Sequence, residues 1–319
     1  MKKISVVVPC YNEEQSLEEL YRTICMVFES KLKSYEYEII LADDYSKDNT
    51  RNVIRQLCSE DSRVKAVFNM ANFGFSRNVF SALTYATGDA AFLVFGDMQD
   101  PPELLPDFVE KWENGSTVVI GKKTGSDESK IMTFFRKCYY DLIDLISDRK
   151  QIRDFNGYGL YDKSFLEVLK RIEDLQPYLK TVISEYAPDY DVVLYRHHES
   201  MRGKSNFDLY RNYDFAMEGI TSSTKKLMRI STFIGAILGI VSGIYAISVF
   251  VRKLLFWDTF PLGLASIMIG VYMLGAIQLF FIGVLGEYML SINTKTMKKP
   301  RVVVKEFINF EQDVEDDHK

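Results

Sequence analysis

The sequence predicts an α/β fold, in which helices cover both faces of a mostly parallel sheet, followed by a hydrophobic helical hairpin. In the first part of the chain, short β-branched runs alternate with segments whose apolar residues recur at helical spacing. Later, residues 230–251 and 259–286 contain no charged side chain. Each of these stretches exceeds the roughly 20 apolar residues that cross a bilayer as a helix.

The first part of the chain is expected to place a helix after each strand. The predicted strands cover residues 4–9, 37–42, 64–68, 91–95 and 117–120. Helices are expected over residues 13–32, from a cap at residues 48–50, over residues 75–87 and from residue 101 onward. Alternation of this kind builds a mostly parallel sheet, whose ligands bind beyond the carboxyl ends of the strands.

Composition excludes several classes of protein. The net charge of −5 argues against a nucleic-acid-binding protein, which needs a basic face. The four cysteines show no paired spacing, which argues against a disulfide scaffold or a zinc site, and the three histidines build no metal motif. The chain opens on a strand-like run that leaves no room for a signal peptide, so we expect the first domain to stay in the cytosol.

Basic residues flank the two charge-free stretches and predict their orientation. Lys225, Lys226 and Arg229 precede the first stretch, and four further Lys and Arg residues follow the second between positions 295 and 301. The connector between the stretches carries only two basic residues, so the positive-inside rule places both ends in the cytoplasm. The alternative, a pair of buried core helices, is disfavoured because core helices are rarely free of charge over such lengths.

These observations predict six segments. They are a cytosolic α/β domain (1–207), a juxtamembrane amphipathic helix (208–229), a first transmembrane helix (230–251), a short external loop (252–258), a second transmembrane helix (259–286) and a cytosolic tail (287–319). A plain solvated helix is the alternative for residues 208–229.

Acidic and polar side chains follow three of the predicted strands. They lie in residues 9–14, 43–46 and 96–100. Taken singly, each cluster could be a helix cap, a turn or a loop. Together they place carboxylates at one edge of the sheet, where a divalent cation and a hydrogen-bonding ligand would relieve their repulsion. Such hard oxygen ligands favour Mg²⁺ or Mn²⁺.

The same residues resemble a known family. The runs Val6 to Glu14, Asp43 to Thr50 and Asp97 to Glu103 resemble family 2 glycosyltransferases. The resemblance is greatest to the polyprenyl-phosphate glycosyltransferases related to dolichol-phosphate mannose synthase and the bacterial GtrB proteins. It extends over nearly the whole chain, including the hairpin and the closing motifs Gly286-Glu287-Tyr288 and Pro300-Arg301-Val302. It implies a GT-A fold, a Rossmann-like nucleotide-binding domain.

The resemblance also implies a donor site and a metal site. A nucleotide-sugar would be bound by Pro9, Tyr11, Asn12, Glu13, Asp43, Asp44 and Asp97. The Mg²⁺ or Mn²⁺ that bridges the donor diphosphate would be held by Asp97 and Gln99. Asp97 is therefore expected to be a catalytic residue as well. The sequence departs from the family at Phe95-Gly96-Asp97, where relatives usually carry Asp-Ala-Asp. Without the first carboxylate, metal binding would lean on Gln99, Asp100 and the diphosphate itself.

An acceptor site follows from the same resemblance. Asp154, in the run Asp-Phe-Asn-Gly, is expected to orient the acceptor or act as its base, with a helix cap as the alternative. Cations at Lys123, Arg136, Arg202 and Lys204, together with Ser205, are expected to bind the acceptor phosphate. The alternative for these cations is an exposed surface position without a ligand.

The expected function is therefore inverting transfer of a sugar from a nucleotide-sugar to polyprenyl (undecaprenyl) phosphate at the bacterial inner membrane. A UDP-sugar is favoured over GDP-mannose, and relatives with this hairpin often assemble as homo-oligomers. One alternative is a membrane protein that binds nucleotide-sugars or serves as a scaffold without catalysis. It is suggested by Phe95, which stands where the family usually has an aspartate. A processive polysaccharide synthase is disfavoured, because neither Trp112 nor Trp257 follows the arginine of a Gln-x-x-Arg-Trp motif.

Overall fold

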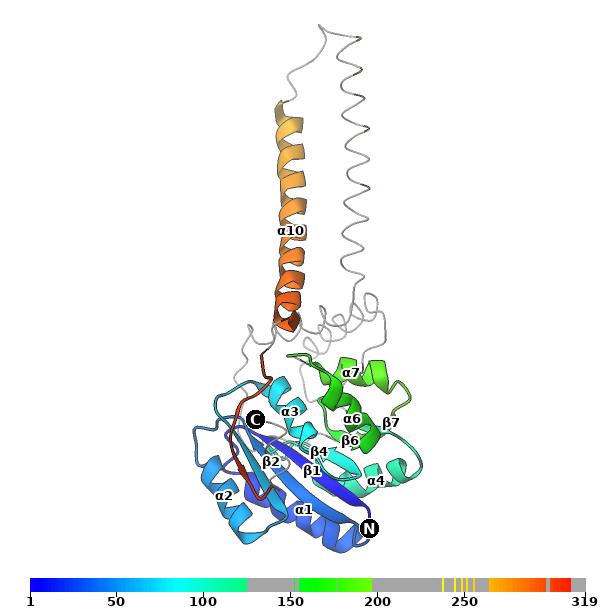
Figure 1. Ribbon diagram of the computed structural model, residues 1–319. Helices are drawn as coiled ribbons and strands as arrows, with labels where there is room; N and C mark the ends of the chain where they lie inside the picture. The colour runs from blue at the N-terminus through cyan, green and yellow to red at the C-terminus, as the bar shows by residue number, and fades with distance from the viewer. Residues whose placement is uncertain are drawn as a thin grey trace.

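A computed structural model describes residues 1–124, 152, 155–175, 177–196, 264–296 and 299–310, together with single positions at 237, 244, 248, 251 and 255. One eight-stranded sheet forms its centre, in the order β7-β5-β6-β4-β1-β2-β3-β8 (Figure 1). The strands are β1 (Lys3–Cys10), β2 (Glu36–Asp43), β3 (Val64–Asn69), β4 (Ala90–Leu93), β5 (Val118–Lys123), β6 (Gly159–Asp162), β7 (Asp191–Tyr195) and β8 (Val304–Ile308).

Most neighbouring strands run parallel. β1 pairs in parallel with β2 and β4, β2 with β3, and β5 with β7. β6 is antiparallel to both β4 and β5, and β8 is antiparallel to β3. The predicted mostly parallel α/β sheet is therefore confirmed.

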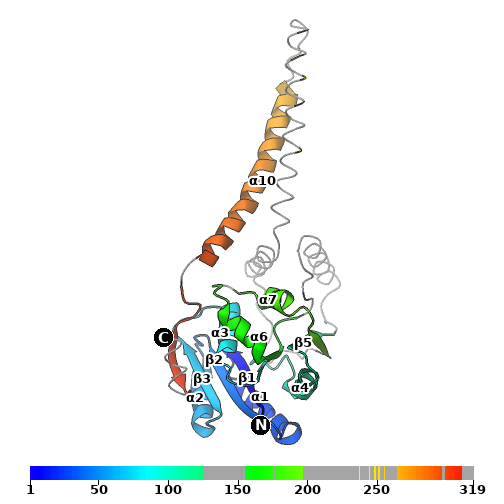
Figure 2. The same ribbon diagram turned by 45° about the vertical axis from the view of Figure 1, so that its right-hand side comes forward.

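Helices cover both faces of this sheet. The helices of this part are α1 (Leu17–Lys31), α2 (Thr50–Glu60), α3 (Phe75–Thr84), the 3₁₀ helix η1 (Pro102–Leu104), α4 (Leu105–Glu113), α6 (Lys163–Arg171) and α7 (Leu179–Tyr186). A further helix, α10 (Leu264–Thr296), does not cover the sheet (Figure 1). α1 contacts α2 and α4, whereas α3 contacts α6, which places the two groups on opposite faces (Figure 1, Figure 2).

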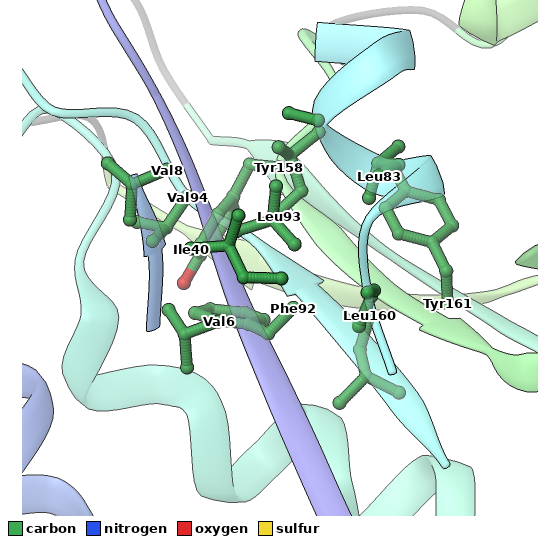
Figure 3. Close-up of a cluster of buried hydrophobic side chains, with 14 of the residues drawn as sticks. Val6, Val8, Ile40, Leu83, Phe92, Leu93, Val94, Tyr158, Leu160 and Tyr161 are labelled. Carbon is green, nitrogen blue, oxygen red and sulfur yellow. The ribbon is translucent and has the colours of Figure 1, made fainter. Parts of the chain in front are cut away.

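The core lies where β1 and β4 meet their neighbours. Its aliphatic and aromatic side chains interdigitate around the two strands (Figure 3). The labelled members are Val6, Val8, Ile40, Leu83, Phe92, Leu93, Val94, Tyr158, Leu160 and Tyr161. Because the central strands are buried on both faces, they read as continuous apolar runs rather than as alternating ones.

A buried carboxylate, Glu38, interrupts this apolar pattern on β2. Its oxygens accept from the Lys3 and Lys65 ammonium groups at 2.7 and 2.8 Å and from the Ser5 hydroxyl at 2.6 Å. They also accept from the Thr87 backbone N–H and hydroxyl. α3 ends at Thr84 rather than at the predicted residue 87, so Thr87 lies outside the helix where it binds Glu38. Burial raises the pKa of Glu38, but the two cations and the other donors outweigh it and hold the pKa at about 2.

We expect this network to make the protein acid-sensitive. Because the folded pKa of Glu38 lies near 2, below an ordinary value of 4.5, its stabilisation is complete above about pH 4.5 and is lost toward pH 2. The shift corresponds to roughly 3 kcal/mol. Glu38→Gln should lower the free energy of unfolding at pH 7 and flatten this pH dependence, measured by chemical unfolding of the full chain in detergent. Glu36→Gln, on the exposed end of the same strand, is the control; equal behaviour of the two variants would contradict the expectation.

The predicted hairpin is described only in part. Residues 208–229 and 252–258, apart from position 255, lie outside the described residues, as does 230–251 apart from isolated positions. α10 begins within the second charge-free stretch, continues past Gly286 to Thr296, and projects away from the sheet in both views (Figure 1, Figure 2). Over the described residues, a set that omits many α10 side chains, no helix is long and apolar enough to cross a membrane.

The chain returns to the sheet after α10. β8 lies along the outer edge of β3, where the Arg55 guanidinium makes two 2.6 Å bonds to the Glu306 carboxylate. The Asn309 amide donates to the Cys58 and Val64 carbonyls, both at 2.8 Å. β8 therefore covers an edge that β3 would otherwise leave unpaired and fastens the segment after α10 to the sheet.

Candidate active site

Three loops converge at one edge of the sheet. Cys10 is opposite Asp43 in the β1–β2 pair, and Val7 is opposite Leu93 in the β1–β4 pair. The carboxyl ends of β1, β2 and β4 therefore lie side by side. The structure thus brings together the three acidic segments that the sequence predicted to meet, at the edge where open α/β sheets bind ligands.

The loops after β1 and β2 are tied together by hydrogen bonds. The Asn12 N–H donates to the Ser46 hydroxyl, and the Lys47 N–H donates to Asn12 Oδ1, both at 2.9 Å. The Glu13 N–H donates to the Thr50 hydroxyl at 2.7 Å. Residues 11–16 form bends and a turn before the helix, and α1 begins at Leu17 rather than at the predicted residue 13. Asn12 itself adopts a left-handed conformation, with φ of 57°.

Asp43 is completely buried at the end of β2. It accepts a 2.6 Å bond from Arg51 Nε and bonds from the Ser46 N–H. Arg51 also donates to the Asn69 carbonyl at 2.9 Å and stacks over the Tyr45 ring at 4.8 Å. Arg51 was missed in the sequence analysis; its position in the first turn of α2, just after the acidic cluster, was the available signal. It compensates the Asp43 charge and orders the turn around Tyr45.

Asp44 follows Asp43 in the chain, and only 3% of the surface of Asp44 is exposed. Its carboxylate accepts from the Asn69 amide at 3.0 Å, the Phe73 N–H at 2.9 Å and the Gly74 N–H at 2.8 Å. Burial raises the pKa of Asp44 above its ordinary value, and these three donors offset only part of that effect. The carboxylate thus fixes the loop that leads into α3, and a pKa shifted by burial is common among groups at functional sites.

Two buried asparagines, Asn69 and Asn78, continue the hydrogen-bond network that begins at Asp44. The Asn78 amide donates to the Ala42 carbonyl at 3.0 Å, and the Asn69 amide donates to Asn78 Oδ1 at 3.1 Å. The first turn of α3 is thereby joined to the ends of β2 and β3. Sequence reasoning assigned neither residue, because each resembles an ordinary polar residue until the strands pair.

Pro9, Tyr11 and Glu13 complete the predicted donor residues at this edge. Pro9 is buried within β1, and Tyr11 is half-buried directly after it. The Glu13 side chain is buried against the loop after β4, where a Cβ at Gly96 would lie 2.9 Å from Glu13 Cγ. The Ser16 hydroxyl donates to the Gly96 carbonyl at 2.5 Å. Glycine at position 96 therefore lets this loop approach the loop after β1.

The predicted metal ligands lie on the loop after β4. Asp97 and Gln99 are both half-buried, and Asp97 Oδ1 accepts the Gln99 N–H at 3.1 Å across Met98, which has a φ of 57°. The described residues contain no group of three or more His, Cys, Asp or Glu side chains arranged to hold a metal ion. Mg²⁺ is commonly bound by one or two carboxylates together with substrate phosphates, and the single carboxylate of Asp97 is compatible with that kind of site.

Phe95 occupies the position where the resemblance suggests a carboxylate. It is 8% exposed, and its ring lies 5.3 Å from that of Phe75 at the start of α3. A Cβ at Gly157 would lie 3.4 Å from Phe95 Cζ. Position 95 therefore makes apolar contacts that join the loop after β4 to α3 and to residue 157.

The acceptor side is described less completely. Lys123 is half-buried at the end of β5, opposite Tyr195 of β7. Asp154, Arg136, Arg202, Lys204 and Ser205 lie outside the described residues. Asn156, two residues after Asp154, donates to the buried Asp100 carboxylate at 2.8 Å. Because Asp100 is fully buried and engaged in this way, we do not assign it to the metal site.

Comparisons with known proteins agree with this architecture. The family model "Glycosyl transferase family 2" matches residues 5–169. A prophage bactoprenol glucosyl transferase homolog of Escherichia coli K12 is 33% identical over 304 residues, which cover 95% of this chain and 98% of the relative. The bactoprenol glucosyl transferase of Shigella phage SfX is also 33% identical over 304 residues, covering 95% of this chain and 99% of the relative.

A solved structure illustrates the shared fold. The crystal structure of mannosyl-3-phosphoglycerate synthase from Rubrobacter xylanophilus aligns with a TM-score of 0.50 and 14% identity, over 74% of this chain and 75% of that chain. The similarity confirms the GT-A architecture of the α/β part. Together with the family match and the full-length relatives, it shows that this chain is a glycosyltransferase belonging to glycosyl transferase family 2.

Proposed function

We propose that this protein transfers glucose from UDP-glucose to a polyprenyl phosphate, forming a lipid-phosphate-linked sugar. The observation that carries the proposal is the 33% identity, over 95% of the chain, to proteins named as bactoprenol glucosyl transferases. The acidic edge formed by the ends of β1, β2 and β4 supports it as a site for a nucleotide-sugar. The glucosyl donor comes from those names, and UDP from the family resemblance.

In the proposed reaction, a lipid phosphate oxygen attacks the anomeric carbon of the sugar. The bond between that carbon and the donor diphosphate breaks, UDP leaves with the bonding electrons, and the configuration inverts in one displacement. Because the phosphate is already an anion at pH 7, little base catalysis is needed. Positioning of the two substrates and stabilisation of charge should dominate the rate enhancement.

The residues divide between the two substrates. The segments around Pro9, Tyr11 and Asn12 and around Asp43 and Asp44 would hold the nucleoside, because they border one edge and are tied together. Asp97 and Gln99 would hold Mg²⁺ or Mn²⁺, which would stabilise the charge on the leaving diphosphate.

On the other side, Asp154 would orient the acceptor. Lys123, Arg136, Arg202, Lys204 and Ser205 would bind its phosphate. Lysine at position 123 offers a point charge rather than the planar fork of an arginine, so its contribution would be less geometrically selective.

We further propose that the charge-free stretches 230–251 and 259–286 anchor the enzyme in the cytoplasmic membrane, with the catalytic domain and both termini in the cytoplasm. The lack of charge in these stretches and the basic residues at their outer ends support this topology. A lipid acceptor would then reach the site without leaving the bilayer. Assembly of several copies through the membrane helices is part of the same proposal.

A donor panel tests the proposed function. The full chain, purified in detergent, would be incubated with undecaprenyl phosphate, Mg²⁺ or Mn²⁺ and one radiolabelled donor at a time: UDP-glucose, UDP-GlcNAc, UDP-galactose or GDP-mannose. We expect label in the lipid extract with UDP-glucose, dependent on the metal ion. Preference for another donor would overturn the choice of sugar, and absence of lipid label with every donor would overturn the function.

One observation favours a second candidate, a nucleotide-sugar-binding protein without catalysis. Phe95 makes apolar contacts at the position where a metal-binding carboxylate was expected. Calorimetry with UDP-glucose in the presence of undecaprenyl phosphate separates the two candidates. Metal-dependent binding without turnover would favour the second.

A further inference from the structure

Asp100 is a buried carboxylate that the proposed mechanism does not use. It follows the metal-binding loop and has no exposed surface. One of its oxygens accepts from the Asn156 amide at 2.8 Å, and the other accepts from the Tyr195 hydroxyl. Its contacts therefore join three segments of the chain: the loop after β4, the segment before β6 and the end of β7.

Each of these segments carries residues proposed to act on a substrate. Asp97 and Gln99 immediately precede Asp100 in the chain. Asn156 lies two residues after Asp154. Tyr195 is the partner of Lys123 in the β5–β7 pair, and its carbonyl accepts from the backbone N–H and hydroxyl of Thr124 at 2.8 and 2.9 Å. Asp100 thus connects the proposed metal ligands to two parts of the proposed acceptor site.

The packing around Asp100 fixes this connection. The Tyr158 hydroxyl donates to the Pro101 carbonyl at 2.6 Å, and its backbone N–H donates to Asn156 Oδ1 at 3.1 Å. The rings of Tyr158 and Tyr195 meet edge to face with centroids 5.0 Å apart. A Cβ at Gly121 would lie 2.2 Å from Tyr158 Cδ1, so glycine is required for the ring to sit there. Both sides of the carboxylate are therefore held in place.

A buried carboxylate is a costly way to join three segments, because apolar packing could do so without desolvating a charge. Burial and then the Asp100 charge raise the pKa of Tyr195, so its hydroxyl stays protonated and donates. The carboxylate accepts from two different donors with defined directions, which an apolar contact cannot do. Because the two hydrogen bonds have fixed directions, they can hold the joined segments at a defined orientation. Transfer between two bound substrates requires such a defined orientation.

We propose that Asp100 is a positioning residue, which holds the acceptor segment at Asn156 and the end of β7 in register with the metal-binding loop. It thereby aligns the acceptor phosphate with the anomeric carbon. The inference rests on the proposed function, since it assumes that an acceptor and a donor meet at this edge. It assigns Asp100 no contact with either substrate.

Exchange of the two partners tests the proposal. Asp100→Asn alone leaves one acceptor oxygen for two donors. Either its NH₂ group faces the Asn156 amide, or the flipped amide turns its NH₂ toward the Tyr195 hydroxyl, which then has to accept instead of donate. Asn156→Asp alone places two carboxylates together. In the double variant the amide at position 100 can donate to the carboxylate at position 156, while the acceptors for the Tyr195 hydroxyl and the Tyr158 N–H are retained. The bonds between positions 100 and 156, from the Tyr195 hydroxyl to position 100 and from the Tyr158 N–H to position 156 are then all possible again. The negative charge is carried by position 156 instead of position 100.

We expect each single substitution to lower kcat for lipid-linked transfer by about a hundredfold, the loss that misplacement by about 1 Å can cause. The double variant should recover most of that loss. Affinity for UDP, measured by calorimetry on the full chain in detergent, should stay near the wild-type value in all three variants. Should Asp100→Asn fail to fold, Tyr195→Phe removes a single hydrogen bond and should lower kcat by about tenfold with UDP affinity retained.

Three results would overturn the proposal. They are an unchanged kcat in Asp100→Asn or Tyr195→Phe, an exchange variant no more active than the single variants, and a loss of UDP binding or melting temperature that accounts for the loss of kcat. A wild-type chain that makes no lipid-linked sugar from any donor would instead overturn the proposed function, and this inference with it. The two failures are thus distinguished by the wild-type reaction.

Discussion

Asp97→Asn is expected to lower kcat for sugar transfer by about a thousandfold, equivalent to roughly 4 kcal/mol of activation free energy. Asp97 is the carboxylate of the proposed metal-binding pair, and Phe95 fills the position where the resemblance suggested another. Asparagine retains the size of the side chain and an oxygen that can accept the Gln99 N–H at 3.1 Å. The loop should therefore keep its conformation while the negative charge is lost.

Incorporation of label from UDP-glucose into the lipid extract, over a series of Mn²⁺ concentrations, measures this effect. High Mn²⁺ should restore part of the activity if the substitution weakens metal binding. Glu103→Gln is the matched control, because Glu103 is an exposed carboxylate on the same stretch of chain, at η1. Equal activity of the two variants at every Mn²⁺ concentration would contradict the assignment of Asp97 to the metal.

Asp44→Asn is expected to destabilise the protein by about 3 kcal/mol and to raise the KM for the donor more than it lowers kcat. The buried carboxylate accepts from the Asn69 amide and from the backbone N–H groups of Phe73 and Gly74. An amide in its place would turn an NH₂ group toward at least one of these donors. The loop into α3 would then loosen at the edge where the nucleoside is proposed to bind.

Chemical unfolding of the full chain and steady-state kinetics with varied UDP-glucose measure the two effects separately. Asp107→Asn is the control, because Asp107 is exposed in the first turn of α4. A fall in kcat with an unchanged donor KM would contradict a role for Asp44 in forming the donor site. Wild-type stability in Asp44→Asn would contradict the argument from its three buried donors.

Much of this site could be located from the sequence because the carboxyl ends of parallel strands meet at one edge. The β-branched runs and the helical spacing between them gave the order of elements as far as β5, and the acidic segments after β1, β2 and β4 follow from that order. The register confirms that these strand ends are adjacent. The roles of the individual site residues stay predictions.

Other parts of the site could not be predicted, because their partners are distant in the chain. Arg51 resembles a surface cation of α2 until β2 and β3 place it beside Asp43 and the Asn69 carbonyl. Glu38 would be placed on the surface by its type alone, yet two lysines from neighbouring strands enclose it. The tail after α10 was expected only as a cytosolic segment, whereas the exposed edge of β3 pairs with its residues 304–308.

The sequence by itself determined the α/β class, the edge at which the acidic loops meet and the two charge-free stretches. Each of these depends on local periodicity or on the order of elements along the chain. Only the tertiary structure decided which carboxylates fix the scaffold, as at Asp44 and Asp100, and that Phe95 makes an apolar contact with Phe75. The reason is physical: a carboxylate is directed by its donors and an aromatic ring by its neighbours, and both come from segments that meet only in the folded chain.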